Sequence, residues 1–149
     1  MNLNLSIYAD GDGGRQAVSS DGAPKAVGPY SQAVRAGGFI YCSGQLPVDP
    51  ATGELVPGGV GEATERCLLN LAAILAAAGA GLADAVQVTV YLADMAQFAS
   101  MNAAYAGFFP AEAGPPARAT VGVASLPKGA PVEIALVALA PAAASAAGG

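Results

Sequence analysis

The chain has 149 residues, room for one domain, and its 54% hydrophobic and 11% charged residues exclude disorder over most of the length. A net charge of -5, with the six cations scattered along the chain, opposes binding to nucleic acid or to an anionic membrane. The absence of histidine excludes Ser-His-Asp and Cys-His catalysis and histidine-ligated metal sites.

Both ends of the chain are expected to lie outside the packed domain. Residues 1–14 end in a run of Gly and Asp typical of a flexible extension, and residues 141–149 contain only Pro, Ala, Ser and Gly. The domain is predicted to span residues 15–140. Residues 1–12 carry no Lys or Arg before their short apolar stretch, unlike a secretory signal, so we expect a cytoplasmic protein.

A β-hairpin, a loop and a helix are predicted in the first half of the domain. Two apolar runs, 32–34 and 39–43, flank a Gly-Gly pair that favours a tight turn. Residues 46–59 contain three prolines and three glycines and are expected to form a long loop. From Val60 apolar residues recur at steps of three and four until Gly79, which predicts an amphipathic helix. Its charge-free stretch is too short for a membrane span.

A strand, a second helix and two more strands are predicted in the second half. Residues 86–92 alternate between apolar and polar, and Asp94 is expected to cap a helix that ends before Pro110. A stripe of large side chains on this helix is expected to be core: Phe98, Met101, Tyr105 and Phe108. The runs 117–124 and 132–139 are predicted to be strands that pair with each other.

The element order ββαβαββ predicts an α+β fold in which two helices cover one face of a mixed sheet. With no third helix to cover the other face, and with so few charges, we expect another subunit to cover it. The chain is therefore predicted to be a homo-oligomer.

Two charges interrupt the apolar strands of the C-terminal half. Arg118 opens one strand and Glu133 lies on the other. One interpretation is that they are exposed edge charges, or partners in an ion pair. The other is that Arg118 offers a planar fork to a substrate carboxylate while Glu133 handles a proton or a water. The pattern alone leaves both open.

Short motifs follow one another along the chain. They are Gly28-Pro29-Tyr30-Ser31-Gln32-Ala33, Ser43-Gly44-Gln45-Leu46-Pro47, Pro50-Ala51-Thr52-Gly53-Glu54, Asn102-Ala103-Ala104-Tyr105, Pro116-Ala117-Arg118-Ala119-Thr120-Val121, Leu126-Pro127-Lys128 and Val132-Glu133-Ile134. In this order they resemble the RidA/YjgF family of reactive-intermediate deaminases, and the resemblance covers residues 23–140.

The resemblance implies a homotrimer of chorismate-mutase-like subunits with three clefts at the subunit interfaces. It implies hydrolysis of a C-N bond in small enamine and imine carboxylates, such as 2-aminoacrylate and its imine tautomer. Ammonia and a 2-oxo acid are released without a metal or organic cofactor, and no nucleic acid or membrane partner is implied.

The resemblance also assigns roles to particular residues. Arg118 is implied to bind the substrate carboxylate through two parallel N-H bonds, and Glu133 to orient the attacking water. Gly44 brings its backbone to the ligand at a point where a Cβ would intrude, and Tyr30 forms a wall of the cleft.

Two further substrate-binding positions are implied, and two cysteines are not. Thr120 stands where many family members have cysteine, so its hydroxyl and backbone amide would bind the ligand and a thiol mechanism is disfavoured. Asn102 matches a family position and is equally consistent with a structural role. Cys42 and Cys67 match no catalytic role and are expected to be buried thiols.

Other functions stay open on the sequence. A regulatory module that binds a small 2-oxo acid or amino acid without turnover would use the same carboxylate pocket. Ribonuclease or chaperone-like action is a third hypothesis, and the acidic balance and lack of histidine oppose RNA cleavage.

Overall fold

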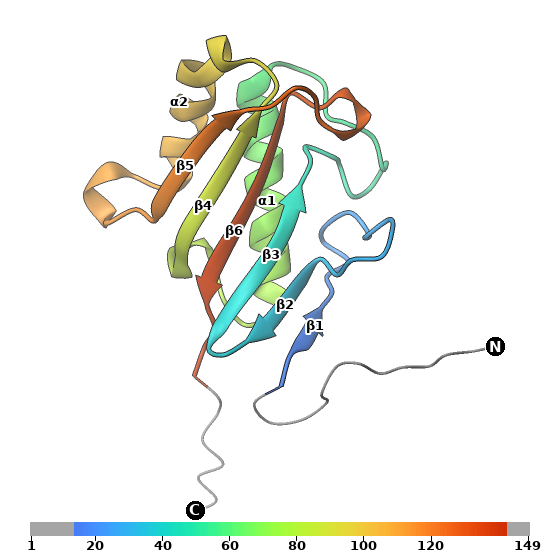
Figure 1. Cartoon of the computed structure of the whole chain (residues 1–149), viewed down its shortest axis with the longest axis vertical. Helices are drawn as coiled ribbons and strands as arrows, with labels where there is room; N and C mark the ends of the chain where they lie inside the picture. The colour runs from blue at the N-terminus through green and yellow to red at the C-terminus, as the bar shows by residue number, and fades with distance from the viewer. Residues whose placement is uncertain (1–13, 143–149) are drawn as a thin grey trace, which may run out of the picture.

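The computed structural model describes residues 14–142, which form one sheet and two helices (Figure 1). The strands are β1 (Gln16–Val18), β2 (Ala33–Ala36), β3 (Phe39–Gln45), β4 (Ala85–Leu92), β5 (Ala117–Gly122) and β6 (Val132–Leu139). The helices are α1 (Val60–Ala77) and α2 (Phe98–Phe108), with short 3-10 turns at Leu82–Asp84, Met95–Gln97, Ala111–Ala113 and Pro127–Gly129. The predicted order ββαβαββ is confirmed, with β1 as an addition. The predicted extensions 1–14 and 141–149 fall almost wholly outside the described range.

The sheet has the strand order β1-β2-β3-β6-β4-β5. All neighbours are antiparallel except β4 and β5, which are parallel because α2 carries the chain back across the sheet between them. Both helices lie on the same face of the sheet (Figure 1). The predicted α+β class with a mixed sheet is therefore confirmed.

The predicted pairing of the last two strands is wrong. β4 lies between β5 and β6, so the strand that carries Arg118 is at an edge of the sheet and does not touch the strand that carries Glu133. Alternate residues of β4 and β6 are fully buried, which gives these two strands the centre of the sheet. β5 has largely exposed residues and takes the edge.

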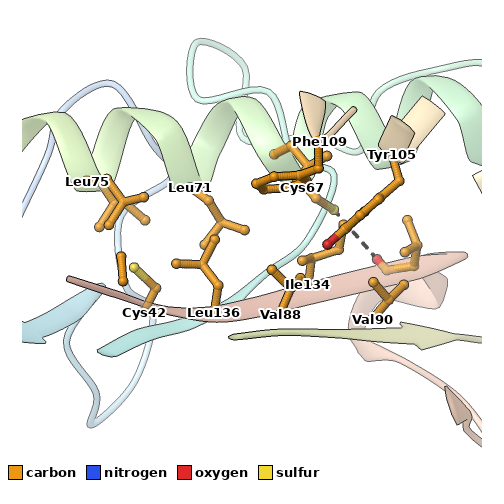
Figure 2. Close-up of a cluster of buried hydrophobic side chains, with 14 of the residues drawn as sticks. Cys42, Cys67, Leu71, Leu75, Val88, Val90, Tyr105, Phe109, Ile134 and Leu136 are labelled. Atoms are coloured by element: carbon orange, nitrogen blue, oxygen red, sulfur yellow. Dashed lines mark hydrogen bonds between the residues drawn. The ribbon is translucent and has the colours of Figure 1, made fainter. Parts of the chain in front are cut away.

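The core fills the space between α1 and the sheet (Figure 2). Leu71 of α1 faces Leu136 of β6, Leu75 faces Cys42 of β3, and the Cys67 thiol donates to the Val132 carbonyl oxygen at 3.9 Å. Cys67 is buried and free, as predicted. Burial, and to a lesser degree the nearby Glu133 carboxylate, raises the pKa of its thiol, so it does not act as a nucleophile.

Cys42 on β3 is likewise buried and free, and burial raises the pKa of its thiol to about 12. The stripe on α2 is only partly core. Met101 and Tyr105 are buried, whereas Phe98 is 37% exposed and Phe108 is half-buried. The expectation that all four are core is wrong for Phe98, because the first turn of α2 stands beside the edge strand rather than over the middle of the sheet, whereas Phe108 packs against the core from a half-buried position.

The second face of the sheet carries apolar side chains that no described element covers. Tyr41, Val121 and Leu139 are each 41 to 49% exposed there. A covering subunit remains the predicted partner of this face. Within the described residues, no helix combines the length and hydropathy that crossing a bilayer requires.

Candidate functional site

A cavity of about 900 Å³ lies where β3 ends and β6 begins. Its lining comes from three loops, residues 21–30, 46–53 and 127–128, together with the ends of the strands that they join. In Figure 1 these loops lie on the right side of the molecule. Three of the predicted site residues line the cavity: Tyr30, Gly44 and Glu133.

Glu133 and Gly44 form the floor of this cavity. The pairing of β3 with β6 shifts register between Cys42 and Gln45, which leaves Gly44 in a bulge beside Glu133. A Cβ on Gly44 would lie 2.9 Å from Cδ and 3.1 Å from Cγ of Glu133. The lack of a side chain at Gly44 therefore leaves room for the Glu133 carboxylate. The sequence predicted instead that this glycine leaves room for a ligand.

The Glu133 carboxylate is partly withdrawn from water. Its side chain is half-buried, and this burial raises the pKa of the carboxyl above its ordinary value. A carboxyl with a raised pKa is suited to accepting and returning a proton near neutral pH. Among the described residues, no group of three or more His, Cys, Asp or Glu side chains could hold a metal ion.

Tyr30 stands at the wall of the cavity and is 51% exposed. Its hydroxyl oxygen accepts a hydrogen bond from the Val27 N-H at 3.2 Å, which holds the ring on its own loop. Below it, the Ser43 hydroxyl donates to the Ser31 carbonyl oxygen at 2.6 Å. Ser43 is thus engaged with the backbone and is not an activated nucleophile.

Three polar side chains fix the loops around the cavity. Gln32 is buried and accepts from the Ser20 N-H at 2.6 Å while it donates to the Pro24 carbonyl at 2.7 Å. Asn70 is fully buried on α1 and donates to the Val48 carbonyl at 2.9 Å. Lys128 donates to the Gly53 carbonyl oxygen at 3.1 Å and has a φ of 59°, the left-handed region that side chains rarely adopt.

The other three predicted residues lie together elsewhere, beside α2. Arg118 is exposed, and its Nη1 donates to Asn102 Oδ1 at 2.7 Å. The Arg118 Cζ lies 4.6 Å from the centroid of the Tyr105 ring and 5.8 Å from that of Phe98. The Asn102 amide therefore meets the arginine, which is a positioning contact.

Two buried hydroxyl oxygens near Arg118 have no hydrogen-bond partner within the described chain. One is that of Thr120, two residues further along β5 on the same face, and the other is that of Tyr105. A buried hydroxyl without a partner costs about 1 to 3 kcal/mol, so such groups are rarely left in this state. The Thr120 hydroxyl, on the edge strand, points to a ligand or another chain beside Arg118, whereas the Tyr105 hydroxyl is turned into the core cluster (Figure 2).

The two groups of residues lie on opposite faces of the sheet. Arg118 pairs with Val88, whose side chain is buried under the helices, so both face the helical layer. Glu133 alternates with the buried Val132 and Ile134, so it faces the other way. One chain therefore brings Tyr30, Gly44 and Glu133 together but does not bring Arg118 to them.

Of the residues that hold these groups, the sequence predicts Asn102 as a site residue and misses the others. Phe98 and Tyr105, expected only as core, lie four residues before and three residues after Asn102, a spacing that places all three on one helical face. The Lys128-Gly129 pair after a proline is a turn signal. For Gln32 and Asn70 no sequence pattern distinguishes an anchoring amide from a surface one.

The comparisons with known proteins agree on one family. The family model described as endoribonuclease L-PSP matches residues 20–140. A RutC family protein of Pyrococcus horikoshii is 47% identical over 124 residues, which are 83% of this chain and 97% of that protein. A Bos taurus protein named 2-iminobutanoate/2-iminopropanoate deaminase is 48% identical over 125 residues, 84% of this chain and 90% of that protein.

Solved structures match equally well. The YjgF gene product of E. coli is 42% identical, with a TM-score of 0.78 over 83% of this chain and 98% of that one. E. coli TdcF with bound serine is 38% identical, with a TM-score of 0.79 over 85% of this chain and 99% of that one. The likeness thus extends over the whole folded part of the chain.

Gly44→Ala should destabilise the protein. The new Cβ collides with the Glu133 side chain, but the atoms that it meets are the far end of a flexible, half-buried side chain that can turn aside, so the cost should stay at the low end of overpacking, about 1 kcal/mol. The free energy of unfolding, measured by urea titration, should fall by that amount. The matched control is Gly61→Ala on α1, where a Cβ meets nothing within 4 Å and helix propensity should raise stability by up to about 1 kcal/mol. Equal effects of both variants would refute the contact.

Glu133→Gln should stabilise the protein in a pH-dependent way. Because burial raises the pKa of Glu133, the folded state binds its proton more tightly than the unfolded chain, and ionisation costs stability as pH rises through the raised pKa. At about pH 7 the variant should be more stable, by less than about 1 kcal/mol for a half-exposed group. The gap should close below about pH 4, where both states are protonated. Urea titrations across this range test it, and a gap that widens toward low pH would contradict it.

Proposed function

Since the chain belongs to the endoribonuclease L-PSP family, which is the YjgF/RidA family, we propose that it hydrolyses reactive 2-imino carboxylates and their enamine tautomers to 2-oxo acids and ammonia. The name of the Bos taurus relative, 2-iminobutanoate/2-iminopropanoate deaminase, supports this reaction. No cofactor is part of the proposal, and the cytoplasm is the proposed location.

The observation that carries the proposal is the division of the chemistry between the two faces of the sheet. The carboxylate-binding group, the Arg118 guanidinium, lies on one face with Asn102 and Thr120. The proton-handling group, the Glu133 carboxylate, lies in the cavity on the other face. A homotrimer would join the Arg118 group of one copy to the cavity of its neighbour. The uncovered apolar face and the Thr120 hydroxyl, which has no partner in the described chain, support such an assembly.

The reaction itself needs positioning more than activation. Arg118 binds the substrate carboxylate through paired N-H donors, which fixes the C=N carbon relative to the cavity. With the imine nitrogen protonated, Glu133 accepts a proton from water as the water oxygen attacks that carbon, giving a neutral carbinolamine. The carboxyl then returns this proton to the nitrogen. The C-N bond breaks as ammonia departs, and the hydroxyl proton passes to the Glu133 carboxylate as the C=O of the 2-oxo acid forms.

A second candidate is a binding module that holds a small amino or oxo acid without turnover. It is favoured by the neighbouring structure of E. coli TdcF, which has bound serine. Both candidates need the carboxylate contact of Arg118, so hydrolysis distinguishes them. Ribonuclease action is not proposed, since the net charge of -5 opposes RNA binding.

Arg118→Ala should remove the activity. With 2-aminoacrylate generated by a lyase and decay of the imine followed by absorbance, loss of the bidentate contact should cost about 2 to 5 kcal/mol in kcat/KM. Arg35→Ala is the matched control, because the Arg35 guanidinium donates to the Pro141 carbonyl instead of lining the proposed site. No acceleration by the wild type would refute hydrolysis. Tight binding of pyruvate in its absence would favour the binding module.

Mixed trimers test the shared site. Arg118→Ala and Glu133→Gln are each expected to be nearly inactive alone. Coexpressed in equal amounts, they should recover about one quarter of the wild-type activity, since one site in about four then combines an intact Arg118 with an intact Glu133 from its neighbour. If both residues served from one chain, the mixture would stay inactive.

A further inference from the structure

We propose that Tyr105 and Phe98 are positioning residues, which with Asn102 hold the Arg118 guanidinium in the orientation that receives a carboxylate. This inference rests on the proposed function, because it concerns how the carboxylate-binding arginine is oriented. It turns part of the predicted core stripe of α2 into part of the binding site.

The need for such a support follows from the location of Arg118. It lies on an edge strand and is exposed, and a long exposed side chain loses considerable rotamer entropy when a ligand fixes it. A guanidinium that is already oriented loses less, so it binds more tightly. The three contacts from α2 provide this orientation.

The contacts act on different parts of the guanidinium. The Tyr105 ring lies 4.6 Å from Cζ, within the range of a cation–π interaction, and Phe98 lies at 5.8 Å, near its limit. Asn102 Oδ1 accepts from Nη1 at 2.7 Å. One N-H of the five is thus engaged with Asn102, which leaves the paired donors that a carboxylate requires.

The Tyr105 ring, and not its hydroxyl, carries this role. The hydroxyl oxygen is buried without a partner in the described chain, while the ring contacts both Arg118 and Phe109, whose centroid is 4.8 Å away. Phe98 gives a second indication. It is 37% exposed, and its ring lies under the Arg118 guanidinium instead of packing into the core.

The experiment compares four variants with the wild type. Tyr105→Leu removes the aromatic face, Tyr105→Phe keeps it, and Phe109→Leu perturbs the same buried ring pair from the side away from the proposed contact. Phe98→Leu is added because Phe98 is partly exposed, so this variant is expected to fold even if Tyr105→Leu does not. Each is assayed for imine hydrolysis, for pyruvate binding by calorimetry, for thermal unfolding, and for the NMR shift of the Arg118 Nε-H.

Tyr105→Leu is expected to raise KM and the pyruvate Kd by about three- to thirty-fold, the range that cation–π strengths imply, with a smaller change in kcat. Tyr105→Phe should restore most of the affinity. Phe109→Leu should lose thermal stability without the rise in KM. The ring-current shift of the Arg118 Nε-H should disappear in Tyr105→Leu and persist in Tyr105→Phe.

Two failures are distinguishable. If the wild type is active and Tyr105→Leu matches Phe109→Leu in KM, Kd and NMR shift, the support is refuted while the proposed function stands. If the wild type neither hydrolyses imines nor binds pyruvate, the proposed function is refuted, and the NMR shift alone then decides whether the rings hold the arginine. Should Tyr105→Leu not fold, a Phe98→Leu variant with unchanged KM, Kd and shift would overturn the inference.

Discussion

The alternation of side chains along a β-strand decides what this chain can do alone. Arg118 falls in register with the helix-covered side of β4, and Glu133 falls in register with the uncovered side. No rotamer change brings them together, because the packed sheet lies between them. Any chemistry that uses both residues must take them from two copies, so the catalytic proposal and the oligomer proposal depend on one geometric fact.

The cavity half of the site is built from loops whose backbones are held by side-chain hydrogen bonds. Loop backbone at a buried surface needs partners for its polar groups, and buried amides supply them: Gln32 for the segment near Tyr30 and Asn70 for the loop that begins at Leu46. Lys128 joins this second loop to the turn before β6. The wall that faces a ligand is therefore already shaped before binding.

Periodicity predicted what depends on local sequence. The α1 repeat, the β4 alternation and the Gly-Gly hairpin can each be recognised from neighbouring residues alone, and the structure contains all three elements. Strand order depends instead on which strands are most deeply buried in the fold. As a result β4 lies between β5, which carries Arg118, and β6, which carries Glu133, contrary to the predicted pairing. The residue spacing also predicted that Phe98 belongs to the stripe of α2. It did not predict that this end of the stripe lies beside the edge strand, where the Phe98 ring faces the Arg118 guanidinium instead of the core.

A single chain leaves an apolar sheet face exposed and a buried hydroxyl unpaired, and assembly with other copies would correct both. The uncovered sheet face exposes Tyr41 and Leu139 to water, which disfavours a free monomer. The Thr120 hydroxyl is buried without a hydrogen-bond partner among residues 14–142, which costs free energy until a donor or acceptor arrives. Assembly of copies would bury the apolar face and enclose the edge beside Thr120, where a ligand carboxylate or a neighbouring backbone could complete the hydrogen bonds. The exposed apolar face and the unpaired hydroxyl both lower the stability of the isolated chain. Assembly would restore this stability at the place where the chemistry is proposed.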